Sequence, residues 1–329
     1  FTNFSSSLGY ILVTKDVSYL LVDFRYIEAA KKTCHNCEVV LFNRLDETLA
    51  NLIKRHNLKS TLLESDSITL TCANSLKMIL ENNNVKAHLN RDLDKIINKI
   101  RMIKSTEEIN KMRISQEITE KAFNNTLNKI RPGITESEIS LDLEFQMKKL
   151  GAERVAFDLI VVSGKNSSLP HGVPSNKPIE KGDFVTIDMG AVYEGYRSDM
   201  TRTVAVSNVS DEQKHIYNIV LDAQMKAIES IKPGIICSEI DKIARDIIYS
   251  SGYEGYFGHS TGHSIGIEEH ENPSFSRSCR SILEPGMIMT IEPGIYLPNK
   301  FGVRIEDMIL VNESGYENLT TIDKQLIVL

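Results

Sequence analysis

The amino-acid sequence predicts an α+β protein with two domains, at residues 1–102 and 103–329. Three observations predict this class. The 329 residues exceed the length of one average domain. Short apolar runs alternate with helical stretches toward the N-terminus, and the rest of the chain contains two copies of one pattern. We therefore expect a small α/β domain followed by a larger domain made of two related halves.

The first domain is expected to alternate strands and helices. Its strands are predicted at four apolar runs: Tyr10–Val13, Tyr19–Val22, Glu38–Phe42 and Ser60–Leu63. Helical periodicity predicts one helix near Arg44–His56 and another near Ser75–Asn82. This alternation is typical of a small α/β domain.

Three helices are expected in the second domain. A long one begins after Ser105, where S-T-E-E has the form of a capping box. Two more follow Pro-Gly turns, at Thr135–Leu150 and Cys237–Ser250. Each of these two meets a glycine, Gly151 or Gly252, which suits the left-handed conformation at a helix C-terminus.

The second domain contains an internal duplication. Ile130–Ile139 resembles Ile231–Ile240, and Glu180–Gly190 resembles Glu284–Gly294, at nearly the same spacing. The period is longer than the ~20 to 50 residues of a solenoid repeat, so it indicates two half-domains related by a pseudo-twofold axis. A site on that axis would collect residues from both halves.

Each half carries two carboxylates at matching places. Asp188 aligns with Glu292, and Asp199 and Glu306 follow in R-S-D-M-T-R-T and G-V-R-I-E-D. A turn at Tyr193–Tyr196 predicts a hairpin in which Asp188 and Asp199 face each other, with Cβ atoms ~4.5 to 5.5 Å apart. Glu292 and Glu306 are expected to pair in the same way.

Four carboxylates brought together need a positive partner, because each buried charge without one costs several kcal/mol. One candidate is a basic side chain, and Arg197, Arg202 and Arg304 lie nearby in the sequence. The other is a pair of divalent metal ions ~3.5 to 4 Å apart. The sequence pattern leaves both readings open.

Histidines concentrate between the acidic pairs. H-S-T-G-H-S-I-G-I-E-E-H contains His259, His263 and His270, and His171 lies in L-P-H-G-V-P of the first half. A single histidine is more often an ordinary polar residue than a ligand. Their density favours a metal site.

These motifs, in the order D, D, H-S-T-G-H, T-I-E-P-G and V-R-I-E-D, resemble those of the pita-bread metallopeptidases, above all Xaa-Pro aminopeptidases and Xaa-Pro dipeptidases (prolidases). G-Y-I-L-V and D-F-R-Y near the N-terminus are similar to the creatinase-type N-terminal domain. The resemblance implies a creatinase-like α/β domain followed by a pita-bread catalytic domain.

The resemblance also implies a two-metal centre. Its ligands would be Asp188, Asp199, His263, Glu292 and Glu306. Manganese is the metal that the family implies most often, with cobalt or zinc as alternatives. Two such ions lower the pKa of a bridging water and so generate a hydroxide nucleophile near neutral pH.

Other residues take roles by the same resemblance. Glu292 would also be the general base, and His171 and His270 would be catalytic hydrogen-bond partners of the scissile region. His259 would line the pocket for the proline ring, and Arg304 would bind substrate or support the ligands. An ordinary turn histidine and a structural arginine are the alternatives for these last two.

The implied activity is hydrolysis of the N-terminal Xaa-Pro bond of peptides with proline in second position. A dipeptidase is the close alternative, while a methionine aminopeptidase or a non-catalytic pita-bread binding module fits the motifs less well. The family also implies a homodimer.

Composition excludes several partners and favours the cytoplasm. A formal charge of −6 with mixed signs argues against nucleic acid or an anionic membrane as a partner. No apolar run approaches the ~20 residues of a membrane span, and no signal peptide is visible, although a chain starting at Phe1 is expected to lack residues that precede it. Five cysteines are unlike a disulfide framework, and the C-x-x-C at Cys34–Cys37 is read as incidental.

Overall fold

The computed structural model describes residue 2 and residues 4–329. The chain forms two compact units, Phe1–Ile97 and Asn98–Leu329. The boundary between the two units lies within helix α4 (Asp92–Met102). The boundary predicted after residue 102 falls at the last residue of this helix. No helix in the described part of the chain combines the length and apolar composition needed to cross a bilayer.

The N-terminal unit is an α/β domain, as predicted. Its strands are β1 (Gly9–Val13), β2 (Ser18–Val22), β3 (Glu38–Leu41), β4 (Ser60–Leu62) and β5 (Lys86–His88). Its other helices are α1 (Ile27–Thr33), α2 (Leu45–His56) and α3 (Leu70–Asn82). Strand β2 pairs antiparallel with β1 and parallel with β3, while β4 and β5 form a parallel pair. Helix α3 begins earlier than predicted because the Thr69 side chain caps it by accepting from Cys72 N–H.

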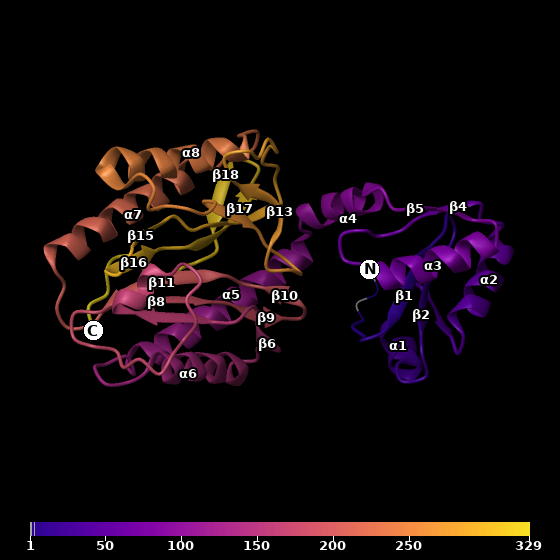
Figure 1. Ribbon diagram of the computed structural model, residues 1–329, viewed down its shortest axis with the longest axis horizontal. Coiled ribbons are helices and arrows are strands. Elements are labelled where there is room, and N and C mark those ends of the chain that lie inside the picture. Colours follow the sequence, from indigo (N-terminus) through magenta and orange to yellow (C-terminus); the bar gives the residue numbers. More distant parts are fainter. Residues whose placement is uncertain (1, 3) are drawn as a thin grey trace. The chain divides into compact units, whose positions relative to one another are not determined.

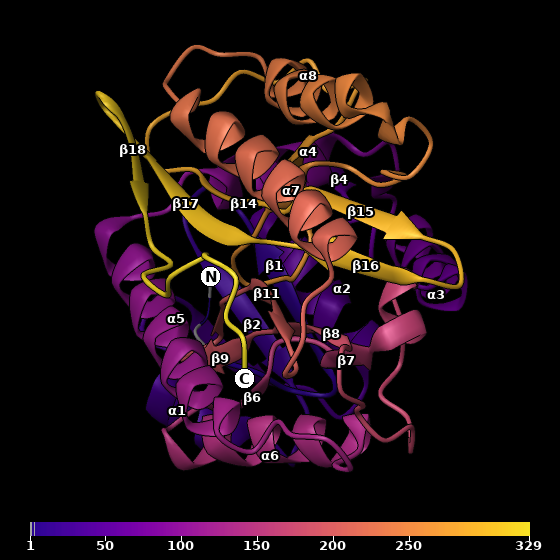
Figure 2. The same ribbon diagram turned by 90° about the vertical axis from the view of Figure 1, so that its left-hand side faces the viewer.

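The larger unit consists of two helix pairs with strands between them. The helices are α5 (Thr106–Leu127), α6 (Glu136–Lys149), α7 (Asp211–Glu229) and α8 (Cys237–Ile248). The strands are β6 (Arg154–Val155), β7 (Ile160–Ser163), β8 (Phe184–Met189), β9 (Ala191–Tyr193), β10 (Tyr196–Arg197), β11 (Met200–Ala205), β12 (Gly262–Ser264), β13 (Glu271–Phe275), β14 (Ile288–Ile291), β15 (Gly294–Leu297), β16 (Phe301–Arg304), β17 (Asp307–Asn312) and β18 (Gly315–Asn318). Figures 1 and 2 show α5 and α6 on one side of these strands and α7 and α8 on the other.

The predicted duplication is visible in the fold. In the first half a backbone bridge joins Thr135, just before α6, to Pro178. In the second half the equivalent bridge joins Ile236, just before α8, to Ile282. The capping box predicted for α5 is present, and another forms at Thr135 at the start of α6. Each half thus packs a helix pair against its own sheet.

Both acidic segments occupy central strands. Strand β8 lies between β7 and β11, and β14 lies between β12 and β17. Phe184 and Ile187 on β8, like Met289 and Ile291 on β14, are fully buried in the hydrophobic core. A central strand buried on both faces is rigid, so the carboxylates at its end are held in fixed positions.

The register of the first hairpin differs from the prediction. A turn at Glu194–Gly195, where both residues have positive φ, joins β9 to β10. The resulting ladder places Asp188 opposite Thr201, so the expectation that Asp188 and Asp199 face each other directly was wrong. The two carboxylates lie at different distances from the turn. Because side chains alternate along a strand, an offset of two residues still leaves both on one face.

The second hairpin has the predicted arrangement. Gly294 pairs with Arg304 in one ladder and Ile291 pairs with Asp307 in the next, in a continuous register. Glu292 therefore lies opposite Glu306 between the two ladders. The four carboxylates approach from two hairpins that belong to different halves.

Candidate metal centre

Every site residue predicted from the sequence lines one cavity of about 800 Å³. The predicted ligands come from strand ends or the residues beside them: Asp188, Asp199, His263, Glu292 and Glu306. The other predicted residues on its wall are His171, His259, His270 and Arg304. Its volume lies within the range of ligand-binding pockets, about 300 to 1,000 Å³.

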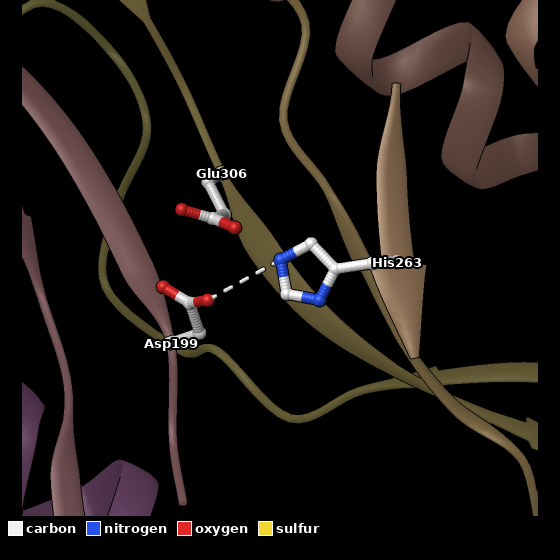
Figure 3. Close-up of side chains that lie close together, drawn as sticks. All are labelled: Asp199, His263 and Glu306. Atoms are coloured by element: carbon white, nitrogen blue, oxygen red, sulfur yellow. Dashed lines mark ion pairs between the residues drawn. The ribbon is translucent and has the colours of Figure 1, made fainter. Parts of the chain in front are cut away.

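Three of these side chains are close enough to share a metal ion. Asp199, His263 and Glu306 offer ligand atoms within 4.8 Å of one another. Figure 3 shows the His263 ring directed at Asp199, with Nε2 3.6 Å from the carboxylate Oδ2. Glu292 Oε1 lies at the same distance from this nitrogen. These separations exceed a hydrogen bond, so the groups converge without bonding to one another.

The orientation of His263 leaves one ring nitrogen free for the centre. Its Nδ1 lies 3.1 Å from the carbonyl oxygen of Ser264, which can only accept, so Nδ1 carries the proton. The backbone N–H of His263 donates to Thr290 Oγ1. Burial, with a smaller effect of His270, lowers the pKa of His263 to about 4. The ring is therefore neutral near pH 7, as a metal ligand must be.

Burial and mutual repulsion raise the pKa values of three of the carboxylates. Burial first, then neighbouring carboxylates, raise the pKa of Asp199 and of Glu306 well above their usual values. Burial, with repulsion from Asp188 and against the opposing field of Arg304, raises the pKa of Glu292 to about 8. Shifts of this kind indicate that the cluster lacks sufficient positive charge of its own.

The residues fit divalent metal ions. Asp188 Oδ1 is buried and has no hydrogen-bond partner among the described residues, which is costly unless a cation or water contacts it. The cluster is rich in carboxylate oxygens and contains one imidazole, a set that suits hard to borderline divalent ions. An unpaired buried oxygen beside converging carboxylates is what a metal centre requires.

Of the three candidate arginines, Arg304 alone pairs with a carboxylate of the cluster, whereas Arg202 reaches only the backbone carbonyl of Glu306. Arg304, nearly fully buried, donates through Nη2 to Asp188 Oδ2 at 2.8 Å. Arg202 instead pairs with Asp307, and Arg197 Nε donates to the Ala156 carbonyl. One guanidinium cannot neutralise four carboxylates, so basic side chains alone do not explain the site.

A chain of hydrogen bonds connects Arg304 to His259 through Tyr296, a residue that the sequence patterns did not single out. Arg304 Nη1 donates to the Tyr296 hydroxyl at 2.9 Å, and this hydroxyl lies 2.9 Å from His259 Nε2. His259 Nδ1 contacts the Ser260 carbonyl oxygen, so Tyr296 donates to Nε2. Burial lowers the pKa of His259 to about 4. His259 thus presents a neutral ring whose two nitrogens are both engaged by the protein.

Thr201 was also missed from the sequence, although it links the two halves. Its hydroxyl donates to Glu306 Oε2 at 2.7 Å and accepts from Arg304 Nε at 3.2 Å. Its carbonyl accepts from the Glu306 backbone N–H. Thr201 therefore orients a carboxylate of the second half from a strand of the first.

His171 and His270 are the exposed histidines among the described residues of the cavity wall. His171 lies in a surface loop, and the His270 side chain is 65% exposed. The His270 ring packs edge-on against His263, with centroids 4.4 Å apart. Both imidazoles can therefore meet a ligand that enters the cavity.

The loop before His270 is anchored by its neighbour Glu271. The Glu271 carboxylate accepts from the backbone N–H groups of Ile267 and Glu268 and pairs with Arg101 and Lys104. It lies so close to Gly266 that a Cβ there would approach its oxygens to 2.8 Å. This ion-paired carboxylate fixes the backbone that carries His270.

The duplicated fold and the carboxylate-rich centre define the pita-bread class of metal-dependent hydrolases. The chain belongs to metallopeptidase family M24, whose model matches residues 110–313. The Creatinase/Prolidase N-terminal domain matches residues 1–103. The predicted family, fold class and hydrolytic peptidase activity are confirmed.

The similar proteins include both Xaa-Pro dipeptidases and an X-Pro aminopeptidase. An Xaa-Pro dipeptidase of Pyrococcus horikoshii is 44% identical over 319 residues, 97% of this chain and 88% of the relative. The solved Xaa-Pro dipeptidase from Bacillus anthracis superimposes with a TM-score of 0.94 at 43% identity, covering 100% of this chain and 91% of that one. The X-Pro aminopeptidase from Thermotoga maritima gives 0.92 at 38% identity, covering 100% and 92%. The comparisons do not separate an aminopeptidase from a dipeptidase.

The metal-free protein is expected to lose stability as the pH rises toward about 8. Glu292 has a pKa of about 8 when folded against an ordinary 4.5, so the folded state holds its proton more tightly than the unfolded state does. The contribution of Glu292 to the unfolding free energy therefore decreases as the pH rises from 4.5 to about 8. Asp199 and Glu306, whose pKa values are also raised, act in the same direction. His263 and His259, with lowered pKa values, act oppositely but only below about pH 6.5.

The measurement is denaturant unfolding of chelated and manganese-loaded protein. From about pH 6.5 to 8 the unfolding free energy of chelated protein should fall by about 2 kcal/mol, whereas metal, which replaces the protons, should suppress the fall. An equal pH dependence with and without metal would contradict the electrostatic description of the cluster.

Proposed function

We propose that this peptidase is a metal-dependent Xaa-Pro aminopeptidase that hydrolyses the N-terminal Xaa-Pro bond of peptides. The observation that carries the proposal is the convergence of four carboxylates and a neutral imidazole on one open cavity. The names of the relatives support the specificity for proline. A peptide substrate is the partner that this cavity suits.

The proposed ligands are those predicted from the sequence: Asp188, Asp199, His263, Glu292 and Glu306. Two divalent ions held there would polarise the scissile carbonyl and lower the pKa of water to make a nucleophile. The family resemblance favours manganese, with cobalt and zinc as alternatives. Arg304 and Thr201 keep Asp188 and Glu306 aimed at the centre through the hydrogen bonds described above.

Glu292 is proposed to transfer a proton from the attacking water to the leaving amine. With metal bound in place of its proton, Glu292 would be an ionised carboxylate on the cavity wall that can accept a proton. It can therefore take a proton from the attacking water and give it to the departing amine nitrogen. His171 and His270, exposed on the cavity wall, are proposed to donate to the carbonyl oxygen as negative charge develops on it.

His259 is proposed to form part of the wall against which the proline ring packs. Both its ring nitrogens are engaged, so it offers substrate a fixed flat face rather than a free donor. This suits proline, whose nitrogen carries no N–H once it is in a peptide bond. Arg304, which was predicted to bind substrate or to support the ligands, contacts Asp188, Tyr296 and Pro170, and of its two roles we propose the support of the ligands.

The charge on the cavity wall favours substrates longer than a dipeptide. A dipeptide places a free carboxylate beside the proline. Among the described residues that line the cavity, the only arginine or lysine is Arg304, which is already paired with Asp188. A longer peptide has a neutral amide at that position, and about 800 Å³ leaves room for it. The dipeptidase alternative is supported by the names of the relatives.

The test compares a tripeptide, Xaa-Pro-Yaa, with the matched dipeptide, Xaa-Pro. Chelated protein is refilled with manganese and its metal content is confirmed before each kcat/KM is measured. We expect the tripeptide to be cleaved with the higher kcat/KM. Cleavage of the dipeptide alone would establish the dipeptidase, and cleavage of neither would refute an Xaa-Pro peptidase.

Two wider expectations accompany this proposal. Family resemblance supports a homodimer, which sedimentation would test. A cytoplasmic location is supported by five cysteines that are all free in the structure.

A further inference from the structure

One carboxylate outside the centre is fully buried and unexplained by the proposed chemistry. Glu136, in the first turn of α6, has no exposed surface. It accepts hydrogen bonds from neutral groups of three residues, Ser163, Asn166 and Ser175. Burying a charge in this way is costly unless its hydrogen bonds are complete.

All of these donors belong to one loop. Ser163 N–H and Oγ donate to Glu136 at 2.7 and 2.9 Å from one end of residues 163–175. Ser175 N–H and Oγ donate at 3.1 and 2.6 Å from the other end. Asn166 Nδ2 adds a contact from within, at 3.1 Å. One carboxylate thus closes both ends of the segment, which we call the His171 loop.

The His171 loop is also attached to the metal centre. Arg304 Nη1 donates to the carbonyl of Pro170, next to His171, at 3.1 Å, and the same guanidinium holds Asp188. Gly302 N–H donates to Ser167 Oγ at 2.9 Å. Residues beside the metal centre therefore hold the middle of the His171 loop, and Glu136 holds its two ends.

The duplication indicates that the helix start does not need this carboxylate. In the alignment of I-R-P-G-I-T-E with I-K-P-G-I-I-C, Cys237 occupies the position of Glu136 in the second half. Cys237 still begins α8, beside a backbone bridge equivalent to the one before α6. At this aligned position a carboxylate is present only in the half whose loop carries His171.

We propose that Glu136 is a positioning residue that sets His171 over the scissile bond by closing the His171 loop. The inference rests on the proposed function of His171. A carboxylate only accepts, whereas a glutamine would turn an amide N–H₂ toward some of these donors. Glu136→Gln keeps the size of the side chain but breaks the closure.

The test is a double-mutant cycle on tripeptide hydrolysis with manganese-loaded protein. We expect Glu136→Gln to lower kcat about 10²-fold, as for a small misplacement of a catalytic group, with metal content unchanged. His171→Ala should lower kcat by about 10² to 10³-fold. Adding Glu136→Gln to His171→Ala should cause no further loss, because the two residues act through one another. Multiplied losses, or full activity in Glu136→Gln, would overturn the proposal.

Glu138→Gln is the matched control. Glu138 lies on the same helix, and its side chain bonds only Thr135 in the described part of the chain, so the same chemical change should leave kcat as in wild type. Hydrogen exchange gives a readout independent of turnover: Glu136→Gln should speed exchange at residues 163–175 and not in α8. Unchanged exchange in the His171 loop would also overturn the proposal.

If Glu136→Gln does not fold, Ser175→Ala removes one donor and leaves the backbone contact. It should lower kcat in wild type and have no effect beside His171→Ala. If Ser175→Ala lowered kcat by the same factor in wild type and in His171→Ala, the proposal would be overturned. A wild-type protein that cleaves no Xaa-Pro peptide would refute the proposed function, and the role of Glu136 would fall with it.

Discussion

Replacing His263 by alanine should sharply lower both metal content and turnover. The substitution removes the one imidazole of the centre, whose Nε2 lies 3.6 Å from Asp199 and from Glu292. Metal catalysis contributes several kcal/mol, so kcat/KM should fall by about 10³-fold or more. The measurements are metal content by mass spectrometry after dialysis and kcat/KM on an Xaa-Pro-Yaa peptide.

Asp246→Asn provides the control for this prediction. Asp246 is an exposed acid on α8 that pairs with Lys242, and its loss should change neither metal content nor kcat/KM. Folding is checked by circular dichroism in both variants. A folded His263→Ala protein with wild-type metal content and activity would show that the ligand assignment is wrong.

Arg304→Met should destabilise the protein and impair catalysis together. It leaves the Asp188 side chain, which is 14% exposed, with neither oxygen paired within the described part of the chain, since Oδ1 already lacks a partner there. Breaking a buried pair from one side costs about 3 to 5 kcal/mol, and the loss should be largest in chelated protein, where no cation replaces the guanidinium. The substitution also frees the carbonyl of Pro170, so kcat should fall about 10²-fold.

Arg202→Met separates this effect from general damage. Arg202 forms a buried pair with Asp307, which keeps a second partner in Lys324, and its contact with Glu306 is to the backbone carbonyl and not to the carboxylate. We expect it to lower the unfolding free energy but to leave the stability difference between chelated and metal-loaded protein as in wild type. If both variants responded equally to metal, Arg304 would be a purely structural residue.

Local patterns predicted the starts of α5 and α6. The capping box at Ser105 and the Pro-Gly turn before Thr135 depend on neighbouring residues only, and α5 and α6 begin where these signals place them. The duplication was equally readable, because it is a comparison within the sequence. It correctly indicated that residues of both halves would gather on one cavity.

Register and long-range polar contacts were harder to predict. Asp188 pairs with Thr201 rather than lying opposite Asp199 because the position of the Glu194–Gly195 turn decides the register. Tyr296 was overlooked because an isolated tyrosine in a strand reads as an ordinary β-former. Its importance arises from Arg304 and His259, which meet it only in the folded chain.

The same limit applies to Glu136. In the sequence it is one of several acids at the start of a helix, where acids are common for electrostatic reasons. Only the fold shows that Ser163 and Ser175 meet on its carboxylate. Buried polar groups that join distant segments leave no local signal.

The most direct test of a metal-dependent Xaa-Pro peptidase is a titration of chelated protein with manganese. Hydrolysis of Xaa-Pro-Yaa and of a matched Xaa-Ala-Yaa peptide is followed at each addition. We predict no turnover in chelated protein, activity that rises to a plateau at about two ions per chain, and cleavage of the proline peptide alone. Full activity without metal, or equal cleavage of both peptides, would contradict the account.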